Sequence, residues 1–292
     1  MNKNADYYNS MWQVEGVSFI QLADHVCAID VENEFCYARI SLYGGNVLSF
    51  IPNGSTPLLY VCRGAVLKDG KAIRGGVPIC APWFGASSIP GFPAHGAVRT
   101  AVWEPDIVTS TVIVLKLNAE SLPEKFAGIT LNYKLYIRLE KELSVDLECS
   151  NFGSKDVDFS AAMHTYFPVN DIKFLRINGL DGKKYFDALT GEEKIQHGDI
   201  IIDREVDRIY QDGGAQIVIL DNGKIIRIDK RNSNSTVVWN PWSEKAKSFS
   251  DYEPDEYTDM ICVEVANARE DARIIPPGTV HRFGMTISEI RS

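Results

Sequence analysis

The sequence predicts an all-β protein, and three observations support this class. Apolar and polar residues alternate with a period of two over 131–139 and again over 143–149, as expected for strands with one buried face. Asn222-Gly223 lies between the apolar runs 217–220 and 225–228, and an Asn-Gly pair supplies the φ > 0 residues of a tight hairpin turn. Long runs at helical spacing are absent. The pattern by itself indicates a large β-sandwich or barrel.

The individual elements follow from these patterns. The alternating runs 131–139 and 143–149 are separated by the charged pair Lys141-Glu142, so we expect an antiparallel hairpin. A second hairpin turns at Asp221-Asn222-Gly223. The best helical candidate, Ser243 to Phe249, is only about two turns long.

Length and composition indicate one domain that spans residues 1–292. Of the 292 residues 45% are hydrophobic, so the chain can bury a substantial core, and all-β proteins of this length often form one domain. The 39 acidic residues exceed the 30 basic ones and give a formal charge of −9. This balance argues against a nucleic-acid partner, because such binding needs clustered positive charge.

The cysteine and N-terminal patterns indicate a soluble cytoplasmic protein. The cysteines form no C-x-x-C pair and no metal-ligand spacing with the histidines, so we expect reduced thiols and no metal site. The N-terminal residues 1–8 lack the apolar stretch of a signal peptide, and no run approaches the ~18 apolar residues of a membrane span. We therefore expect no membrane partner. The cysteines are Cys27, Cys36, Cys62, Cys80, Cys149 and Cys262.

The segment 74–99 has the composition of a polar-ligand pocket. It carries Arg74, His95 and Arg99 among glycines, prolines and aromatic residues. Glycine and proline suit irregular backbone close to a ligand, aromatic rings offer an apolar floor, and basic groups donate hydrogen bonds. His95 belongs to a loop, where it is free to meet a ligand. The alternatives are a buried connection whose arginines satisfy carbonyl groups, and a loop-capping hydrogen bond for His95.

His164 and Glu264 are the residues best suited to acid/base chemistry. His164 lies in a strand-like run in which Ala162, His164 and Tyr166 share one face, and these neighbours leave room for a ligand. Glu264 lies mid-strand with apolar residues on the opposite face, so its carboxylate must reach solvent or a polar cavity. The alternatives are a satisfied core histidine and a surface glutamate on an edge strand.

Four further segments, taken with residues 74–103, give the chain a family resemblance. They are Met163-His-Thr-Tyr-Phe167, Val206-Asp-Arg-Ile-Tyr210, Val238-Trp-Asn-Pro-Trp242 and Cys262-Val-Glu264. In this order and spacing, from about residue 39 to residue 282, the set resembles the hexose-6-phosphate mutarotases, the glucose-6-phosphate 1-epimerase branch of the aldose 1-epimerase family. The resemblance implies a galactose-mutarotase-like β-supersandwich, with the ligand site on the concave face of a large curved sheet.

The resemblance also implies a reaction and a role for each residue. Exchange of aldose anomers removes the proton of the C1 hydroxyl while the ring oxygen is protonated, so that the ring opens and recloses. Matched to the family motifs, Glu264 is the general base and His164 the general acid. His95 and Arg74 hold sugar hydroxyls and the ring oxygen, and Asp207 binds substrate. The chemistry needs neither metal ion nor nicotinamide cofactor. We expect a monomer whose partner is a small-molecule hexose phosphate.

Two of the binding residues have open alternatives. We hypothesise that Arg99 contacts the 6-phosphate, because arginine binds phosphate through paired charge-assisted donors. Alternatively, Arg99 forms a structural ion pair with Glu104 or Asp106. Asp207 has the alternative of pairing only with Arg204 or Arg208 at the surface.

Two positions depart from the family motifs. The chain has Ala81 and Ala97 where the family usually has aromatic residues. If those rings line the pocket, the site is roomier in this chain; if they point into the core, nothing functional changes. The remaining histidines, His25, His197 and His281, have no supporting context, and we expect them to be surface or structural residues.

Two other functions fit the same pattern. One is a neutral-sugar aldose 1-epimerase, and the other is a non-catalytic module that binds sugar phosphates, since fold alone does not fix function. The presence of both His164 and Glu264 argues against a binding module, because binding alone needs no matched acid and base.

Overall fold

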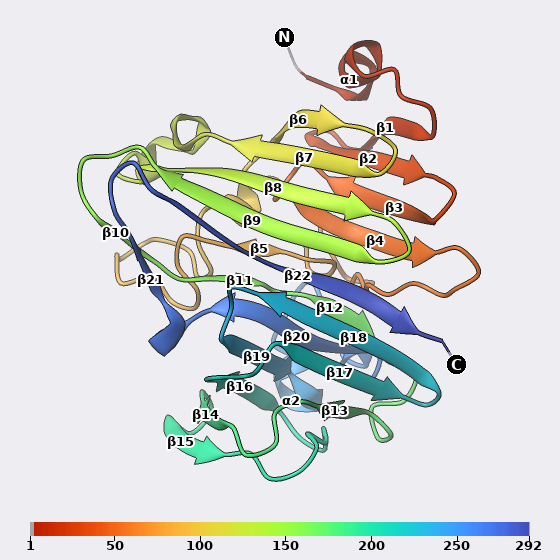
Figure 1. Cartoon of the computed structure of the whole chain (residues 1–292), viewed down its shortest axis with the longest axis vertical. Helices are drawn as coiled ribbons and strands as arrows, with labels where there is room; N and C mark the ends of the chain where they lie inside the picture. The colour runs from red at the N-terminus through yellow and green to blue at the C-terminus, as the bar shows by residue number, and fades with distance from the viewer. Residues whose placement is uncertain (1–2, 292) are drawn as a thin grey trace.

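The fold is built from antiparallel β-sheets in a computed structural model that describes residues 3–291 (Figure 1). Two sheets have eight strands each, a third has four and a fourth has two. The all-β class predicted from the sequence is therefore confirmed. Met1 and Asn2, the first residues of the segment in which we expect no signal peptide, lie outside the described residues.

One eight-stranded sheet, here called the site sheet, carries Asp207 and Glu264, and His164 lies between two of its strands. β20 (Met260–Asn267) lies in its interior, between β19 (Ser235–Asn240) on one side and the short strands β11 (Ala161–Met163) and β12 (Tyr166–Pro168) on the other. Because β20 pairs with strands on both sides, Glu264 does not lie on an edge strand. All eight residues of β20 are buried. The other strands of the sheet are β5 (Ile79–Cys80), β14 (Lys184–Asp187), β15 (Glu192–Ile195) and β16 (Val206–Tyr210).

The second eight-stranded sheet, here called the back sheet, contains both predicted hairpins. β8 (Leu131–Leu139) pairs with β9 (Leu143–Asn151), with Leu139 opposite Leu143. β17 (Gln216–Asp221) and β18 (Lys224–Arg231) turn at Asn222 and Gly223, whose φ angles are 42° and 90°. Positive φ at both turn positions matches the twist of the flanking strands. The other strands are β6 (Glu104–Val108), β7 (Val112–Leu117), β13 (Arg176–Asn178) and β22 (Val280–Ile290).

Two smaller sheets complete the strand inventory. The four-stranded sheet runs in sequence order, and the two-stranded sheet joins distant parts of the chain. The two-stranded sheet consists of β10 (Val157–Phe159) and β21 (Arg273–Ile275). The four-stranded sheet consists of β1 (Val17–Ala23), β2 (Val26–Glu32), β3 (Cys36–Ser41) and β4 (Asn46–Pro52).

The helices are few and short. α2 (Trp242–Ala246) begins one residue earlier and ends three residues earlier than expected. The sequence patterns did not predict α1 (Ala5–Met11), which Asn4 caps by accepting a hydrogen bond from the backbone N–H of Tyr7. No helix within residues 3–291 is long and apolar enough to cross a membrane. The 3₁₀ helices are η1 (Val98–Thr100), η2 (Ala119–Ser121), η3 (Glu124–Phe126), η4 (Glu256–Thr258) and η5 (Arg269–Asp271).

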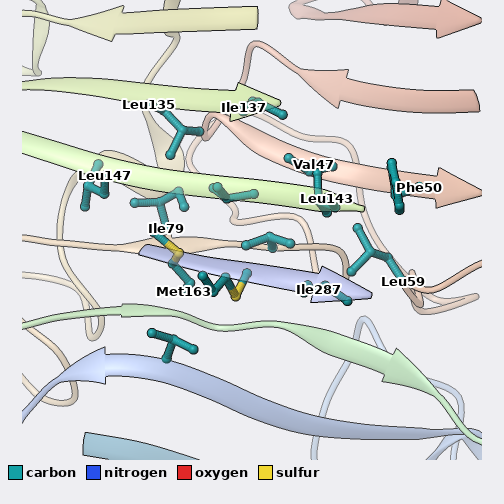
Figure 2. Close-up of a cluster of buried hydrophobic side chains, with 14 of the residues drawn as sticks. Val47, Phe50, Leu59, Ile79, Leu135, Ile137, Leu143, Leu147, Met163 and Ile287 are labelled. Atoms are coloured by element: carbon teal, nitrogen blue, oxygen red, sulfur yellow. The ribbon is translucent and has the colours of Figure 1, made fainter. Parts of the chain in front are cut away.

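The main hydrophobic core leaves one face of the site sheet free for a pocket. In Figure 2, Ile79 of β5 and Met163 of β11 gather with apolar side chains of β4, β8, β9 and β22. The apolar residues of β20 that alternate with Glu264 belong to the same core; they are Ile261, Val263 and Val265. Because neighbouring strand residues point to opposite faces, Glu264 points away from this core.

Candidate active site

A pocket of about 450 Å³ brings together all the residues that the sequence singled out for function. The loop before β5, the loop between β5 and η1, and strands β16, β19 and β20 contribute to its walls. The predicted residues that line it are Arg74, His95, Arg99, His164, Asp207 and Glu264.

The register of the site sheet explains how distant segments meet at the pocket floor. Glu264 lies opposite Val237 on β19, and two residues further along β19 Trp239 lies opposite Asp207 of β16. Residues two apart on a strand share a face, so the four side chains point the same way. All four line the pocket.

His164 reaches the pocket at a break between two strands. β11 ends at Met163 and β12 begins at Tyr166, and the backbone N–H of His164 donates to the carbonyl of Pro78 at 2.9 Å. The imidazole stacks on the Tyr166 ring with centroids 5.1 Å apart, and the Trp239 ring meets it edge-on at 5.8 Å. Aromatic packing on two sides fixes the orientation of this imidazole.

His164 and Glu264 form a buried pair. Nε2 of His164 lies 3.4 Å from Oε1 of Glu264, and their side chains are 13% and 1% exposed. His164 Nδ1 and Glu264 Oε2 have no hydrogen-bond partner among residues 3–291. Buried polar atoms are rarely left unpaired, so these two are available to a ligand or to water.

Burial favours the neutral form of each member of this pair. Loss of solvation raises the pKa of Glu264 well above its usual value, and the charge of Asp207 raises it further. Loss of solvation lowers the pKa of His164 well below its usual value, and His95, Arg99 and Arg74 add to the effect. In the form that burial favours, with Glu264 protonated and His164 neutral, the pair holds one titratable proton.

His95 is held as a neutral hydrogen-bond donor at one side of the pocket. Its φ is 63°, and its backbone N–H donates to the carbonyl of Gly85 at 2.7 Å. Nδ1 accepts the N–H of Gly85 at 3.4 Å, which leaves the ring proton on Nε2. Burial, with Arg99 and Arg74, lowers the pKa of His95 to about 3. The hydrogen bond between Gly85 and His95 is thus the loop-capping contact that the alternative proposed, and His95 lines the pocket as well.

Arg74 and Arg99 differ in how their charge is compensated. Nε of Arg74 donates to Oδ1 of Asp251 at 3.1 Å. Arg99 donates to the carbonyl of Ala94 at 3.0 Å, and no carboxylate within residues 3–291 pairs with it. The expected alternative partners of Arg99 are engaged elsewhere: Glu104 pairs with Lys3, and Asp106 with Lys116 and Lys134. The guanidinium of Arg99 thus lines the pocket without a carboxylate partner among the described residues.

Asp207 faces the pocket without a cationic partner in the described part of the chain. Arg204 pairs with Asp203, and Arg208 lies over the Tyr185 ring at 5.0 Å, so neither expected alternative is formed. Burial raises the pKa of Asp207 to about 6, with further contributions from nearby acidic residues.

Several pocket residues were not assigned a site role from the sequence. Trp239 and Tyr166 lay within the quoted motifs, and period-two alternation from His164 places Tyr166 on the same face. The position of Trp239 depends on the register of β19 with β16, which alternation along one strand does not give. Phe249, Asp251 and Lys71 lie in loops, where no periodic pattern indicates direction. The unassigned polar or aromatic lining residues are Lys71, Phe84, Thr100, Tyr166, Trp239, Phe249 and Asp251.

The positions that depart from the family motifs belong to the core. Ala81 and Ala97 are 0% and 1% exposed, pack in the main core and do not line the pocket.

The remaining histidines also lie outside the pocket: His25 and His197 are exposed, and Nε2 of His281 lies 2.8 Å from Oδ1 of Asn267. All six cysteines are buried and free. No group of three or more potential metal-ligating side chains occurs among the residues described.

The fold is that of the galactose-mutarotase-like proteins. The crystal structure titled "a putative mutarotase" from Salmonella typhimurium superposes with a TM-score of 0.86 at 26% identity, with 94% of each chain covered. A galactose mutarotase-like protein from Lactobacillus casei shares the fold, with a TM-score of 0.70 at 15% identity over 90% of this chain and 100% of that one.

The chain belongs to the aldose 1-epimerase family, whose model matches residues 28–288. Two relatives carry the name "Putative glucose-6-phosphate 1-epimerase". The relative from Cenchrus ciliaris is 33% identical over 88% of this chain and 82% of its own length. The relative from Escherichia coli strain K12 is 28% identical over 92% of each chain.

Proposed function

We propose that the protein is an isomerase that interconverts the α and β anomers of a hexose 6-phosphate, with glucose 6-phosphate as the substrate. The observation that carries the proposal is the buried pair of His164 and Glu264, 3.4 Å apart, on the floor of a pocket that also holds the unpaired guanidinium of Arg99. The pair supplies a base and an acid, and Arg99 supplies a binding group for an anion.

In the ring-opening step Glu264 accepts the proton of the C1 hydroxyl and His164 donates a proton to the ring oxygen. The bond between C1 and the ring oxygen breaks, and C1 becomes an aldehyde. After rotation about the C1–C2 bond, the C5 hydroxyl attacks the other face of the aldehyde. His164 then takes the C5 hydroxyl proton while Glu264 returns its proton to the C1 oxygen.

The single titratable proton of the pair supports this order of proton transfers. Moving its single proton from Glu264 to His164 gives the base and the acid that ring opening requires. Hydrogen bonds from the C1 hydroxyl to the carboxylate, and from the imidazolium to the ring oxygen, would stabilise that ionised form. After ring opening the pair is again protonated Glu264 and neutral His164, the form that burial favours.

The pocket walls suit the rest of a sugar phosphate. The rings of Phe84, Trp239 and Phe249 offer flat apolar surfaces for the C–H faces of a sugar. His95 donates from Nε2 to a sugar oxygen, and Asp207 accepts from sugar hydroxyls. We assign the 6-phosphate to Arg99, and the sugar or its phosphate-proximal edge to Arg74.

Proton NMR magnetisation exchange between the anomers tests the proposal against its alternatives. Acceleration of the exchange of glucose 6-phosphate above that of galactose and glucose supports it. A preference for the unphosphorylated sugars would indicate a neutral-sugar epimerase. Binding without any acceleration would leave a non-catalytic module and contradict the proposal.

A further inference from the structure

The carboxylate of Asp251, which lines the pocket, contacts two basic side chains at once. Its Oδ1 accepts a hydrogen bond from Nε of Arg74 at 3.1 Å, and its Oδ2 lies 3.7 Å from Nζ of Lys71. Nζ of Lys71 also donates to Oγ of Ser250 at 3.1 Å. The turn after α2 therefore holds two basic residues of the loop that precedes β5.

Aromatic packing adds a second constraint on Arg74. Its guanidinium lies 4.3 Å from the centroid of the Phe249 ring and 5.9 Å from that of Tyr252. The rings and the carboxylate together restrict both the plane and the direction of the guanidinium. Arg74 remains 21% exposed and lines the pocket, so its other donors are available to a ligand.

The backbone that carries Asp251 is itself fixed from two sides. A Cβ on Gly64 would lie 2.7 Å from the nitrogen of Tyr252 and 2.9 Å from the carbonyl carbon of Asp251, so the two segments are in close contact. Oε2 of the buried Glu256 accepts the backbone N–H of Glu253 at 2.6 Å. The carboxylate of Asp251, only 8% exposed, is thus in place before a ligand arrives.

Asp251 orients the two cations without neutralising both. One carboxylate balances one positive charge, so the cluster of Lys71, Arg74 and Asp251 retains an excess of one positive charge. Lys71 is more exposed than Arg74, at 36% against 21%, and both line the pocket. The exocyclic phosphate of a hexose 6-phosphate is the substrate group that would meet this excess charge.

We propose that Asp251 is a positioning residue that holds Arg74 against the sugar and Lys71 toward its phosphate, and that Lys71 is a further substrate-binding residue. The inference rests on the proposed function. It concerns substrate binding and leaves the proton transfers to His164 and Glu264. Removing the carboxylate should therefore weaken binding of substrate while the bound substrate still reacts.

The test compares Asp251→Asn with a matched control in the glucose 6-phosphate exchange assay. We expect Asp251→Asn to raise KM about tenfold with kcat within twofold, and Asp251→Glu to recover part of the loss. Lys71→Met should raise KM about threefold for glucose 6-phosphate and leave that for glucose unchanged. The control is Asp30→Asn, whose carboxylate binds Arg39 through two 2.7 Å hydrogen bonds in the four-stranded sheet and should change neither constant.

Thermal denaturation and direct calorimetric binding of glucose 6-phosphate complete the test. An unchanged KM in folded Asp251→Asn, or a fall in kcat alone, would overturn the inference. If Asp251→Asn does not fold, Asp251→Glu carries the test, and an unchanged affinity in that variant would also overturn it. Failure of the proposed function looks different: the wild-type protein would not accelerate the exchange at all.

Discussion

Asp207 and Glu264 point into the same pocket from strands on either side of β19, and the charge of Asp207 disfavours ionisation of Glu264. Among the cationic groups near Glu264, Arg99 acts in the opposite direction. The protonation state of the proposed catalytic pair therefore depends on residues to which the proposed mechanism assigns no proton transfer.

This relationship predicts the pH dependence. The active pair holds one proton, so kcat/KM should fall at low pH when both groups are protonated and at high pH when neither is. The two limbs belong to the coupled pair, with His95, Arg74, Arg99 and Asp207 as the charged or titratable neighbours. After subtraction of spontaneous mutarotation, a flat profile from about pH 4 to 9 would remove the acid/base pair from consideration.

Asp207→Asn should shift both limbs of the kcat profile to lower pH. Removing a negative charge makes each proton of the pair easier to lose, so both apparent pKa values fall. KM should rise as well, because Asp207 is a proposed substrate ligand. Asp203→Asn, which removes an exposed carboxylate outside the pocket, is the matched control and should shift neither limb.

Glu264→Gln and His164→Asn should each lower kcat by at least ~10²-fold, since each removes one half of the proton relay. The double variant should be little worse than either single one, because the two groups act as a unit. Circular dichroism and thermal denaturation establish that each variant is folded. Nearly full activity in folded Glu264→Gln would show that another group is the base.

Arg99→Ala should reduce kcat/KM for glucose 6-phosphate by roughly 10- to 10²-fold and hardly change the turnover of glucose. This corresponds to about 1.5 to 3 kcal/mol for the loss of a hydrogen bond to a charged group. Arg204→Ala, whose side chain is 73% exposed outside the pocket, is the control. Equal losses on both substrates would assign Arg99 to the fold or to the sugar ring.

Ala97→Phe should lower the free energy of unfolding by about 1 to 3 kcal/mol, because a ring inserted into a filled core forces its neighbours to shift. Its KM should stay close to that of the wild type, since Ala97 does not line the pocket. Urea denaturation measures the first effect. Ala127→Phe, at an exposed alanine, should leave stability within about 0.5 kcal/mol. A changed KM with unchanged stability would place position 97 at the site.

The sequence predicted the features that depend on local pattern. Alternation and the Asn222-Gly223 turn located both hairpins, and a carboxylate flanked by apolar strand residues marked Glu264 as unusual. The pairing of Trp239 with Asp207 depends on strand register between distant segments, which no local period encodes. Asp251 was missed because loop direction depends on tertiary packing, and α1 because a short helix gives a weak periodic signal.

The proton that His164 and Glu264 share in the proposed mechanism also determines whether the reaction exchanges protons with solvent. Ring opening takes one proton from the sugar and gives one back, and ring closure repeats the exchange in reverse between the same groups. A complete turnover thus consumes no proton from solvent and releases none. Spontaneous mutarotation in water relies on dissolved acids and bases, whereas we expect turnover by a pair buried this deeply to be independent of buffer concentration.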